Sequence, residues 1–530
     1  MTLKRIVLSV LTLLVVWVMG SSLIKSLGEP QVGNQLQLYQ TDLLVQASEW
    51  DGSGLPENEV TQFRKAVFGE DAFTAAIEQY REVRKDAATG LARLRQQLEN
   101  TPESEENSNL ATMAIARSQQ LLIDQIDLRL GFVQIQQQQE NKALSTWESL
   151  AQRPGPSANV ATTLIDLWQT PPEVPPNAAT IINNQLRGWF RYTALDRLYT
   201  LEEEIEQRDQ LEQNEVAIAE KTLIQLSVVG ILPSLGGLIG SGLLIALVGQ
   251  RLLRGKEAVL TLGEENTWQV PWDWETVWLV MVGGFFFVGQ LALPGTIAIV
   301  RGLMQSATLQ AAVILPPQLV DSGIAIAGFI SLVIGESSRG RAITSSALYV
   351  LMSVSTLGVL YWAIKEHLPL SKDWFRINPA GRWPVWGFGG YLVALPLMLG
   401  VSLLNQQIWQ GQGGNNPILQ IVLEERDPVV LGLFLFTAAI AAPIFEEILF
   451  RGFLLPSLTR YMSTWTAIGL SSLIFATAHL SFSEVLPLAV LGAVLGFVYT
   501  KSQNLMSSIL LHSTWNSVTM IGLFLLGSGS

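Results

Sequence analysis

Apolar and polar stretches along the chain predict membrane-spanning helices next to a water-soluble part. The first long apolar stretch runs from Ile6 to Ile24 and follows Lys4 and Arg5. A basic flank before an apolar run is typical of a cleaved signal peptide or of an uncleaved anchor. Because the run is long for a signal peptide, we interpret residues 1–28 as an N-terminal membrane anchor, with a signal segment as the alternative.

Residues 29–222 carry a different pattern. Apolar positions recur every three or four residues between polar stretches rich in Gln and Glu, which is the pattern of amphipathic helices. Leu130–Gly131, Ala143 and Trp147 lie at the offsets of a tetratricopeptide-type helical hairpin. One unit is weak support, because such repeats need neighbours to bury their apolar faces. We therefore predict a soluble helical domain, either tetratricopeptide-like or an ordinary helical bundle.

From residue 223 onward the sequence consists mainly of apolar segments separated by short polar connections. Several segments reach the ~20 residues that a membrane-spanning helix requires. The segments are Leu223–Gln250, Thr276–Val300, Leu309–Gly335, Thr344–Ile364, Val385–Leu404, Pro428–Phe450, Thr464–Leu480, Val485–Thr500 and Ser507–Leu526. The predicted fold class is all-α, a polytopic transmembrane helix bundle of about 8–10 spans with an N-terminal helical soluble domain.

Composition sharpens this division. The chain has 530 residues, of which 15% are charged, and a mean hydropathy of +0.32. Residues 29–222 hold 30 acidic and 16 basic residues, a net charge of −14, whereas residues 223–530 hold only 15 acidic and 14 basic residues. Since soluble domains contain about 25% charged residues, a single water-soluble fold is excluded. The lack of a basic cluster argues against nucleic acid as a partner, and the absence of cysteine removes thiolate nucleophiles and Cys-ligated metals.

The orientation of the spans stays open at this point. The Arg251–Lys256 stretch indicates a cytoplasmic loop under the positive-inside rule, and so do Arg339 and Arg341. The Lys365–Arg382 stretch gives the same indication although it lies one span further along. These assignments conflict unless one segment crosses the membrane differently, so the number and parity of the spans are undecided.

The segment Pro428–Phe450 ends in two adjacent carboxylates, Glu446 and Glu447, and Arg451 follows them. An ionised side chain within a bilayer costs ~2.5–3.5 kcal/mol on insertion scales, so such residues normally face a bundle interior or a water-filled cavity. Glu447 and Arg451 are four residues apart and can pair along one helix face. Glu446 points about 100° away from Glu447 and is the candidate general base. A structural ion-pair network that locks helices together is the alternative.

Two of the three histidines fall in the apolar segments that follow, which favours a functional site. His479 ends a Phe-x-x-x-His sequence, and His512 begins a His-x-x-x-Asn sequence whose i, i+4 spacing puts His512 and Asn516 on one helix face. We expect these side chains and Glu446 to converge on one pocket that holds a water. A carboxylate and an imidazole can activate the water, while a second His and an Asn amide can stabilise an oxyanion.

The three motifs together are specific. Glu-Glu-x-x-x-Arg, Phe-x-x-x-His and His-x-x-x-Asn, in this order on consecutive apolar helices, resemble those of the CAAX protease and bacteriocin-processing (CPBP) family of intramembrane endopeptidases. This family includes the type II CAAX prenyl endopeptidases, or Abi proteins. The resemblance places a CPBP protease core at residues 428–530, preceded by further transmembrane helices at residues 223–427. It does not cover residues 29–222.

The resemblance implies a role for each motif residue. Glu446 and His479 would activate the catalytic water, and His512 and Asn516 would hold the oxyanion. The supporting residues that orient the helix would be Glu447 and Arg451.

The resemblance leaves the use of a metal open. The family has been described both as metal-dependent and as glutamate-dependent without metal. If a Zn²⁺ ion is bound, its candidate ligands are Glu446, Glu447, His479 and His512. Because no His-Glu-x-x-His sequence is present, we favour the metal-free mechanism and expect no cofactor.

The sequence thus predicts an integral, multi-pass membrane endopeptidase, with a bacterial plasma membrane or a thylakoid membrane as plausible locations. Its partners would be the lipid bilayer and a peptide or membrane-protein substrate, and the soluble domain is a candidate for binding a protein. Buried Glu and His also carry protons in transporters, so a transporter or proton relay is one alternative. A non-catalytic membrane scaffold is the other.

Overall fold

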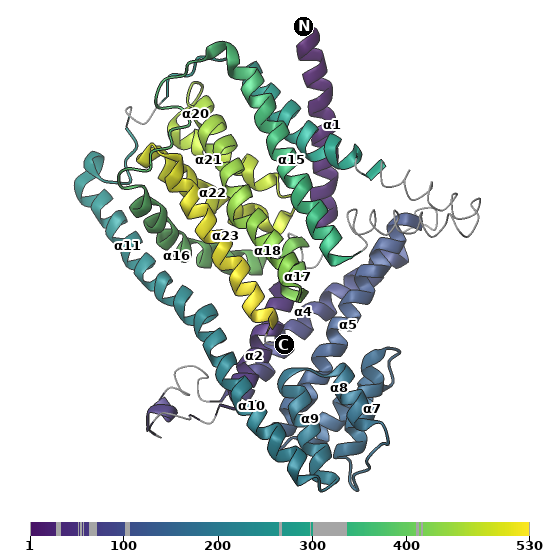
Figure 1. Cartoon of the computed structure of the whole chain (residues 1–530). Coiled ribbons are helices and arrows are strands. Elements are labelled where there is room, and N and C mark those ends of the chain that lie inside the picture. Colours follow the sequence, from purple (N-terminus) through teal and green to yellow (C-terminus); the bar gives the residue numbers. More distant parts are fainter. Residues whose placement is uncertain are drawn as a thin grey trace, which may run out of the picture. The chain divides into compact units, whose positions relative to one another are not determined.

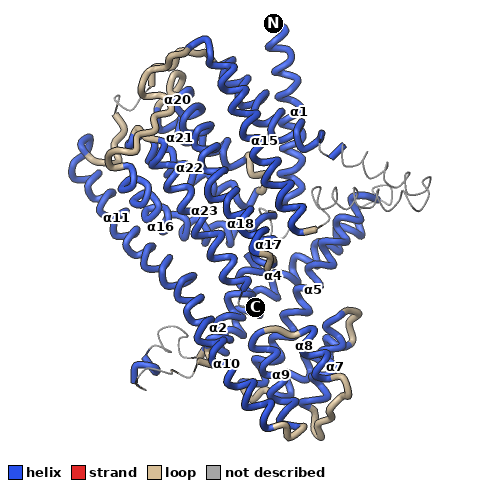
Figure 2. The backbone as a smooth tube through the Cα atoms, in the orientation of Figure 1, coloured by secondary structure: helices blue, strands red, loops and turns tan. Residues whose placement is uncertain are grey.

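The structure is a computed structural model of the chain, and it is built from helices and their connections (Figures 1 and 2). It describes residues 2–27, 33–50, 52, 56, 58–62, 71–100, 106–263, 268–296, 298–299, 337–409, 413–414 and 417–528. No strand occurs within these ranges, which confirms the all-α fold class. The predicted span Leu309–Gly335 lies outside the described residues.

The chain folds into two compact units. One, the membrane unit, comprises Met1–Leu27, Ser234–Ile408 and Asn416–Ile521, and the other, the soluble unit, comprises Gly28–Pro233, Trp409–Asn415 and Gly522–Ser530. The predicted N-terminal anchor therefore belongs to the membrane unit. The domain boundary predicted between residues 222 and 223 falls inside one continuous helix, Ile205–Glu257. A change from polar to apolar composition does not by itself end a helix, because both kinds of residue are helix formers.

The soluble unit contains a series of antiparallel helices. They are α2 (Gly33–Ala47), α4 (Ala72–Asn100), α5 (Glu106–Gln136), α6 (Glu140–Ala151), α7 (Pro156–Trp168), α8 (Ala178–Gln185), α9 (Gly188–Leu201) and α10 (Ile205–Leu226). A Cβ on Gly131 would lie 2.1 Å from Trp147 Nε1, so α5 approaches α6 closely only because residue 131 is glycine. Trp147 Nε1 donates a hydrogen bond to the Leu128 carbonyl at 3.1 Å. The predicted hairpin residues therefore contact each other, whereas the repeat assignment stays a prediction.

A buried ion pair connects three helices of the soluble unit. Arg129 Nη2 of α5 lies 2.9 Å from Asp42 Oδ2 of α2, and its Nε contacts both oxygens of that carboxylate. The Tyr80 hydroxyl of α4 donates to Asp42 Oδ1 at 2.8 Å. Burial, together with the Asp42 charge, holds the pKa of the Tyr80 hydroxyl well above its ordinary value.

Eight helices among the described residues are long and apolar enough to cross a membrane. This confirms a polytopic helix bundle and an integral, multi-pass membrane protein. The helices of the membrane unit are α1 (Leu3–Ser26), α11 (Leu232–Arg254), α12 (Trp274–Trp278), η4 (Leu279–Ala292), α15 (Ser338–Ile364), α16 (Trp383–Trp409), α17 (Pro417–Glu424), α18 (Pro428–Phe436), η6 (Thr437–Ala441), α19 (Ala442–Glu446), η7 (Glu447–Leu454), α20 (Leu455–Leu458), α21 (Thr464–Thr477), α22 (Phe482–Ser502) and α23 (Leu505–Ser528).

The predicted segments that carry the first two motifs end at other residues in the structure. The segment Pro428–Phe450 continues to Leu458, since the arginine that follows it is accommodated inside the bundle. The segment Thr464–Leu480 ends earlier, at Thr477, and Leu480 has a φ of 59°. This left-handed backbone conformation ends a helix. His479 therefore lies in the turn after α21 and not within a helix.

Small residues bring α21 and α22 together. A Cβ on Gly492 would lie 2.9 Å from Ser472 Cβ, and one on Gly496 would lie 3.2 Å from Ile468 Cγ2. Helices in a membrane associate through such close packing, because lipid supplies no hydrophobic driving force between them. This contact fixes the turn that carries His479 beside the other helices of the core.

Candidate active site

Glu446 and Glu447 lie where a membrane helix changes its winding. The α-helical turn α19 ends at Glu446, and η6 before it and η7 after it are π-helical. Pro443 is the second residue after η6 and has no N–H to donate to the preceding turn, which favours such local widening. π-Helical turns occur frequently at functional sites. The motif spacing predicted a helix at this position but not its π-helical winding.

Glu447 and Arg451 form the predicted ion pair within η7. Arg451 Nη1 lies 2.7 Å from Glu447 Oε1, and both side chains are almost completely buried. Arg451 Nη2 also donates to the Gly492 carbonyl of α22 at 3.2 Å, and the guanidinium lies 4.5 Å from the centre of the Phe475 ring. The pair therefore ties η7 to both α21 and α22. A buried arginine needs such partners to offset its desolvation.

His512 connects this pair to Glu446. Its Nδ1 lies 2.9 Å from Glu447 Oε1, and its Nε2 lies 3.9 Å from Glu446 Oε2. An ionised carboxylate can only accept a hydrogen bond. Nδ1 of His512 therefore carries a hydrogen and donates a hydrogen bond to Glu447 Oε1. This contact orients the ring so that Nε2 points to Glu446.

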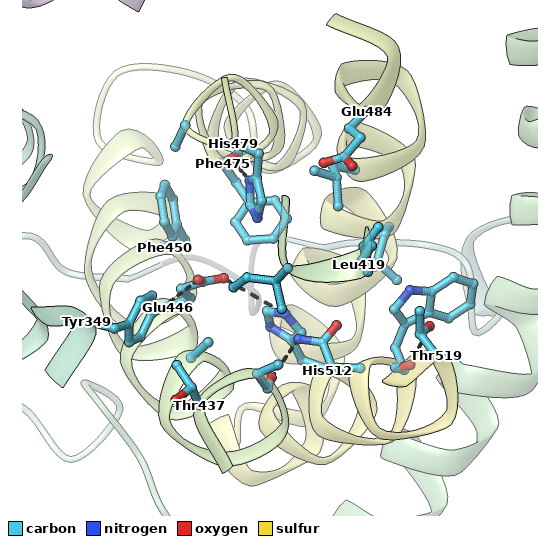
Figure 3. A pocket seen from close by; sticks show the side chains of 18 of the residues that line it. Tyr349, Leu419, Thr437, Glu446, Phe450, Phe475, His479, Glu484, His512 and Thr519 are labelled. Atoms are coloured by element: carbon cyan, nitrogen blue, oxygen red, sulfur yellow. Dashed lines mark hydrogen bonds and ion pairs between the residues drawn. The ribbon is translucent and has the colours of Figure 1, made fainter. Parts of the chain in front are cut away.

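Glu446 accepts a hydrogen bond from α15, a helix that was not predicted to reach the site. The Tyr349 hydroxyl of α15 donates to Glu446 Oε1 at 2.7 Å (Figure 3). One carboxylate oxygen thus faces Tyr349 and the other faces His512. Tyr349 was missed because a single tyrosine within an apolar span carries no local signal, and the contact joins residues 97 positions apart.

The His479 side chain is held by a backbone carbonyl one helical turn earlier. Its Nδ1 lies 2.9 Å from the Phe475 carbonyl, the residue that begins the Phe-x-x-x-His motif. A carbonyl accepts a hydrogen bond, so Nδ1 donates and Nε2 is the basic nitrogen. The Gln290 amide of η4 donates to the Ala478 carbonyl at 3.3 Å. Like Tyr349, Gln290 lies far upstream and was not predicted.

Asn516 lies one turn after His512 on α23, on the same helix face. Its Nδ2 donates to the Ala438 carbonyl in η6 at 2.8 Å. An amide nitrogen has two hydrogens, so this bond orients the side chain and leaves the second hydrogen for another acceptor.

All four predicted catalytic residues border one cavity of about 400 Å³ (Figure 3). In the close-up, Glu446 and His512 lie across the cavity from His479, and Glu484 of α22 lies at one side. Glu484 is a further lining residue that the sequence analysis did not select. The rest of the lining is mainly apolar and includes Met398, Leu419, Leu488, Trp515 and Met520. The cavity therefore joins a polar centre to an apolar wall.

The predicted metal ligands are not arranged as one group. Among the described residues, no cluster of three or more His, Asp or Glu side chains could hold a metal ion. Glu447 Oε1 is bonded to Arg451 and His512, which places a cation against one of the candidate ligands.

Comparison with known proteins bears on this site. Residues 428–518 match the family model of the Rce1-like type II CAAX prenyl endopeptidases. The C-terminal part of the chain is similar to this family. The matched region contains every predicted catalytic and supporting residue, whereas Gln290 and Tyr349 lie outside it. The similarity supports an intramembrane protease, and it gives no support to a transporter or a scaffold.

Two curated relatives agree with this assignment. The chain is 27% identical over 195 residues to the membrane-embedded CAAX protease MroQ of Staphylococcus aureus (strain USA300), a match that covers 34% of this chain and 76% of the relative. It is 34% identical over 82 residues to the UPF0177 protein YxdF of Lactococcus lactis subsp. lactis (strain IL1403), covering 15% of this chain and 45% of the relative. The chain thus spans less than half the length of the second relative. No solved structure matches the chain significantly.

Proposed function

We propose that the chain is an intramembrane endopeptidase that hydrolyses peptide bonds with a water activated by Glu446 and His479. The supporting observation is that Glu446, His479, His512 and Asn516 border a single cavity. Each of these side chains is fixed by a separate hydrogen bond to a protein group. Preorganised polar groups of this kind stabilise a transition state without reorganisation during the reaction.

In the proposed reaction, Glu446 and His479 take a proton from the water as its oxygen attacks the peptide carbonyl. The negative charge that develops on the carbonyl oxygen accepts hydrogen bonds from His512 Nε2 and Asn516 Nδ2. The C–N bond then breaks, and the proton passes from the Glu446–His479 pair to the leaving amine. Because His512 Nδ1 already donates to Glu447, Nε2 can donate only when the ring is an imidazolium.

The cavity also suggests a class of substrate. Its wall includes Met398, Leu419 and Trp515, so an apolar side chain next to the scissile bond would be buried there. We therefore propose that the substrate is an apolar peptide segment at or within the membrane. None of the lining residues specifies a prenyl group, and a protein partner of the soluble unit stays a prediction.

A cleavage assay with the purified full chain in detergent tests this proposal. Peptides with an apolar segment and a flanking fluorophore–quencher pair would be incubated with the wild type and with Glu446→Gln. Loss of a general base lowers the rate by about 100-fold or more. The control is Glu366→Gln, an exposed carboxylate in the loop after α15, which should cleave like the wild type. Full activity of Glu446→Gln would contradict the proposal.

A chelator arm tests the metal-free part separately. We expect unchanged cleavage after dialysis against a chelator, because the proposed steps use only side chains. Loss of cleavage that added Zn²⁺ restores would overturn the metal-free mechanism while leaving the protease assignment intact.

A further inference from the structure

Helix α11 touches α16 through two glycines. A Cβ on Gly240 would lie 1.9 Å from the Leu392 carbonyl oxygen, and a Cβ on Gly236 would lie 2.8 Å from Leu395 Cδ1. The contacts run in opposite directions along the two helices, so α11 and α16 are antiparallel neighbours (Figure 1). The C-terminal end of α11 therefore lies at the level of the N-terminal end of α16.

Toward that level α11, α16 and α22 enclose a second cavity, of about 470 Å³. Its lining consists entirely of apolar residues and glycine. Val259 and Leu260, in the loop after α11, also line it. This cavity is separate from the candidate active site and shares none of that site's lining residues. On α22, Leu491 lines the active site and its neighbour Val490 lines this cavity.

Basic residues lie on the loop side of this cavity. Residues four apart share one helix face. On α11 and α22 a basic residue lies four positions from a lining residue, and Arg382 directly precedes α16, four positions before Trp386. The pairs of lining residue and cation are Leu247 with Arg251, Trp386 with Arg382, and Phe497 with Lys501.

The loop brings these cations to one end of the cavity. Lys501 Nζ donates to the Thr261 carbonyl at 2.8 Å, and the Gln250 side chain accepts a hydrogen bond from the Val259 amide. The C-terminal end of α22 therefore lies beside the C-terminal end of α11. Arg254, seven residues after Leu247, is on the same face of α11 and is exposed.

We propose that this cavity binds a phospholipid with an anionic headgroup, with one acyl chain in the apolar cavity and the phosphate at Arg251, Arg254 and Arg382. Apart from the indole N–H groups of Trp386 and Trp465, no side chain of the lining carries a hydrogen-bond donor or acceptor, whereas a chain of CH₂ groups fits the cavity. Anionic lipids attract basic residues next to membrane helices, by about 1 kcal/mol for each Lys or Arg. The occupant thus satisfies both the cavity and the charges at its mouth.

Native mass spectrometry of the delipidated full chain in detergent tests the proposal. The probes are dioleoylphosphatidylglycerol and, as a zwitterionic comparison, dioleoylphosphatidylcholine. We expect one phosphatidylglycerol to bind in preference to phosphatidylcholine. Neutralising two cations in Arg251→Gln/Arg254→Gln should weaken phosphatidylglycerol binding by about 30-fold, which is ~2 kcal/mol. Arg251→Lys/Arg254→Lys keeps the charges and should bind like the wild type.

A second variant tests the cavity itself. Gly389 lines the cavity, and a Cβ there would meet no atom within 4 Å, so Gly389→Leu fills the space without a clash. This substitution should abolish the binding of added phosphatidylglycerol. Gly400→Leu on the same helix is the matched control, because a Cβ at Gly400 also meets no atom within 4 Å and Gly400 does not line the cavity.

The outcomes separate the possible sources of binding. Equal binding of the two lipids, or displacement of phosphatidylglycerol by inorganic phosphate, would overturn the proposal. An effect of Gly389→Leu without an effect of Arg251→Gln/Arg254→Gln would mean a chain site without headgroup selection. The reverse pattern would mean surface attraction outside the cavity. Either result would also overturn it.

Discussion

Each unit contains a buried pair of arginine and carboxylate, and the two pairs differ in what they support. In the soluble unit Arg129 contacts both carboxylate oxygens of Asp42. In the membrane unit Arg451 contacts a single oxygen of Glu447, and His512 contacts the same oxygen. The first pair also accepts a hydrogen bond from Tyr80, and neither of its residues lines the candidate active site. The second pair orients a histidine that borders a cavity.

This difference shows why a buried ion pair alone is weak evidence of function. Removing two charges from water costs several kcal/mol per ion, and their attraction repays this only with good geometry. Both pairs meet that condition. What distinguishes the membrane pair is the neighbour it positions, since His512 Nε2 faces Glu446 and not a structural partner.

The strongest test replaces the whole membrane pair with apolar residues. Such replacements of a buried pair are often neutral for stability, so Glu447→Leu/Arg451→Met should remain folded. His512 would lose the acceptor at Nδ1, and we expect cleavage to fall by about 100-fold, as when one oxyanion donor is removed. The measurements are peptide cleavage and the thermal unfolding midpoint in detergent. A folded variant with wild-type cleavage would show that the pair is purely structural.

The soluble pair should give the opposite result. Asp42→Asn leaves the Arg129 charge without its partner, and because the Arg129 side chain is 18% exposed the cost should lie below the about 3–5 kcal/mol of a fully buried pair. Because this pair orients no residue of the cavity, cleavage per folded molecule should stay unchanged. Denaturant unfolding followed by the soluble unit's helical signal, together with the cleavage assay, checks both parts. A fall in cleavage at unchanged stability would remove the contrast between the two pairs.

The sequence predicted features that depend on neighbouring residues, but not contacts between residues far apart in the chain. Hydropathy located the spans, and the motif spacing located Glu446, His479, His512 and Asn516, because each signal is carried by neighbouring residues. Tyr349 reaches Glu446 across 97 positions, and nothing beside it in the chain marks that contact. The change to π-helical winding around Glu446 depends on packing and on Pro443, and it also left no pattern in the sequence. The site's geometry therefore required the fold.

Tyr349→Phe tests that long-range contact. The ring keeps its edge-to-face contact with Phe445, at 6.2 Å between centroids, so we expect wild-type stability. The lost hydrogen bond holds the Glu446 carboxylate in place, and its removal should lower kcat by about tenfold, or ~1.4 kcal/mol, with KM unchanged.

The kcat and KM of peptide cleavage, measured separately, check this prediction. Tyr361→Phe, at an exposed position of the same helix, is the matched control and should keep the wild-type kcat. A wild-type kcat in Tyr349→Phe would mean that the tyrosine only packs.

The smallest expected effect is that of Tyr80→Phe in the soluble unit. At neutral pH the variant loses the hydrogen bond to Asp42, and its free energy of unfolding should fall by about 1 kcal/mol. The raised pKa of Tyr80 means that the unfolded chain releases this proton at lower pH than the folded chain. The wild type therefore loses stability as pH rises past about 10, and Tyr80→Phe does not. The difference between the two proteins should shrink over that range, whereas a constant difference in alkaline unfolding curves would show that Tyr80 ionises equally in both states.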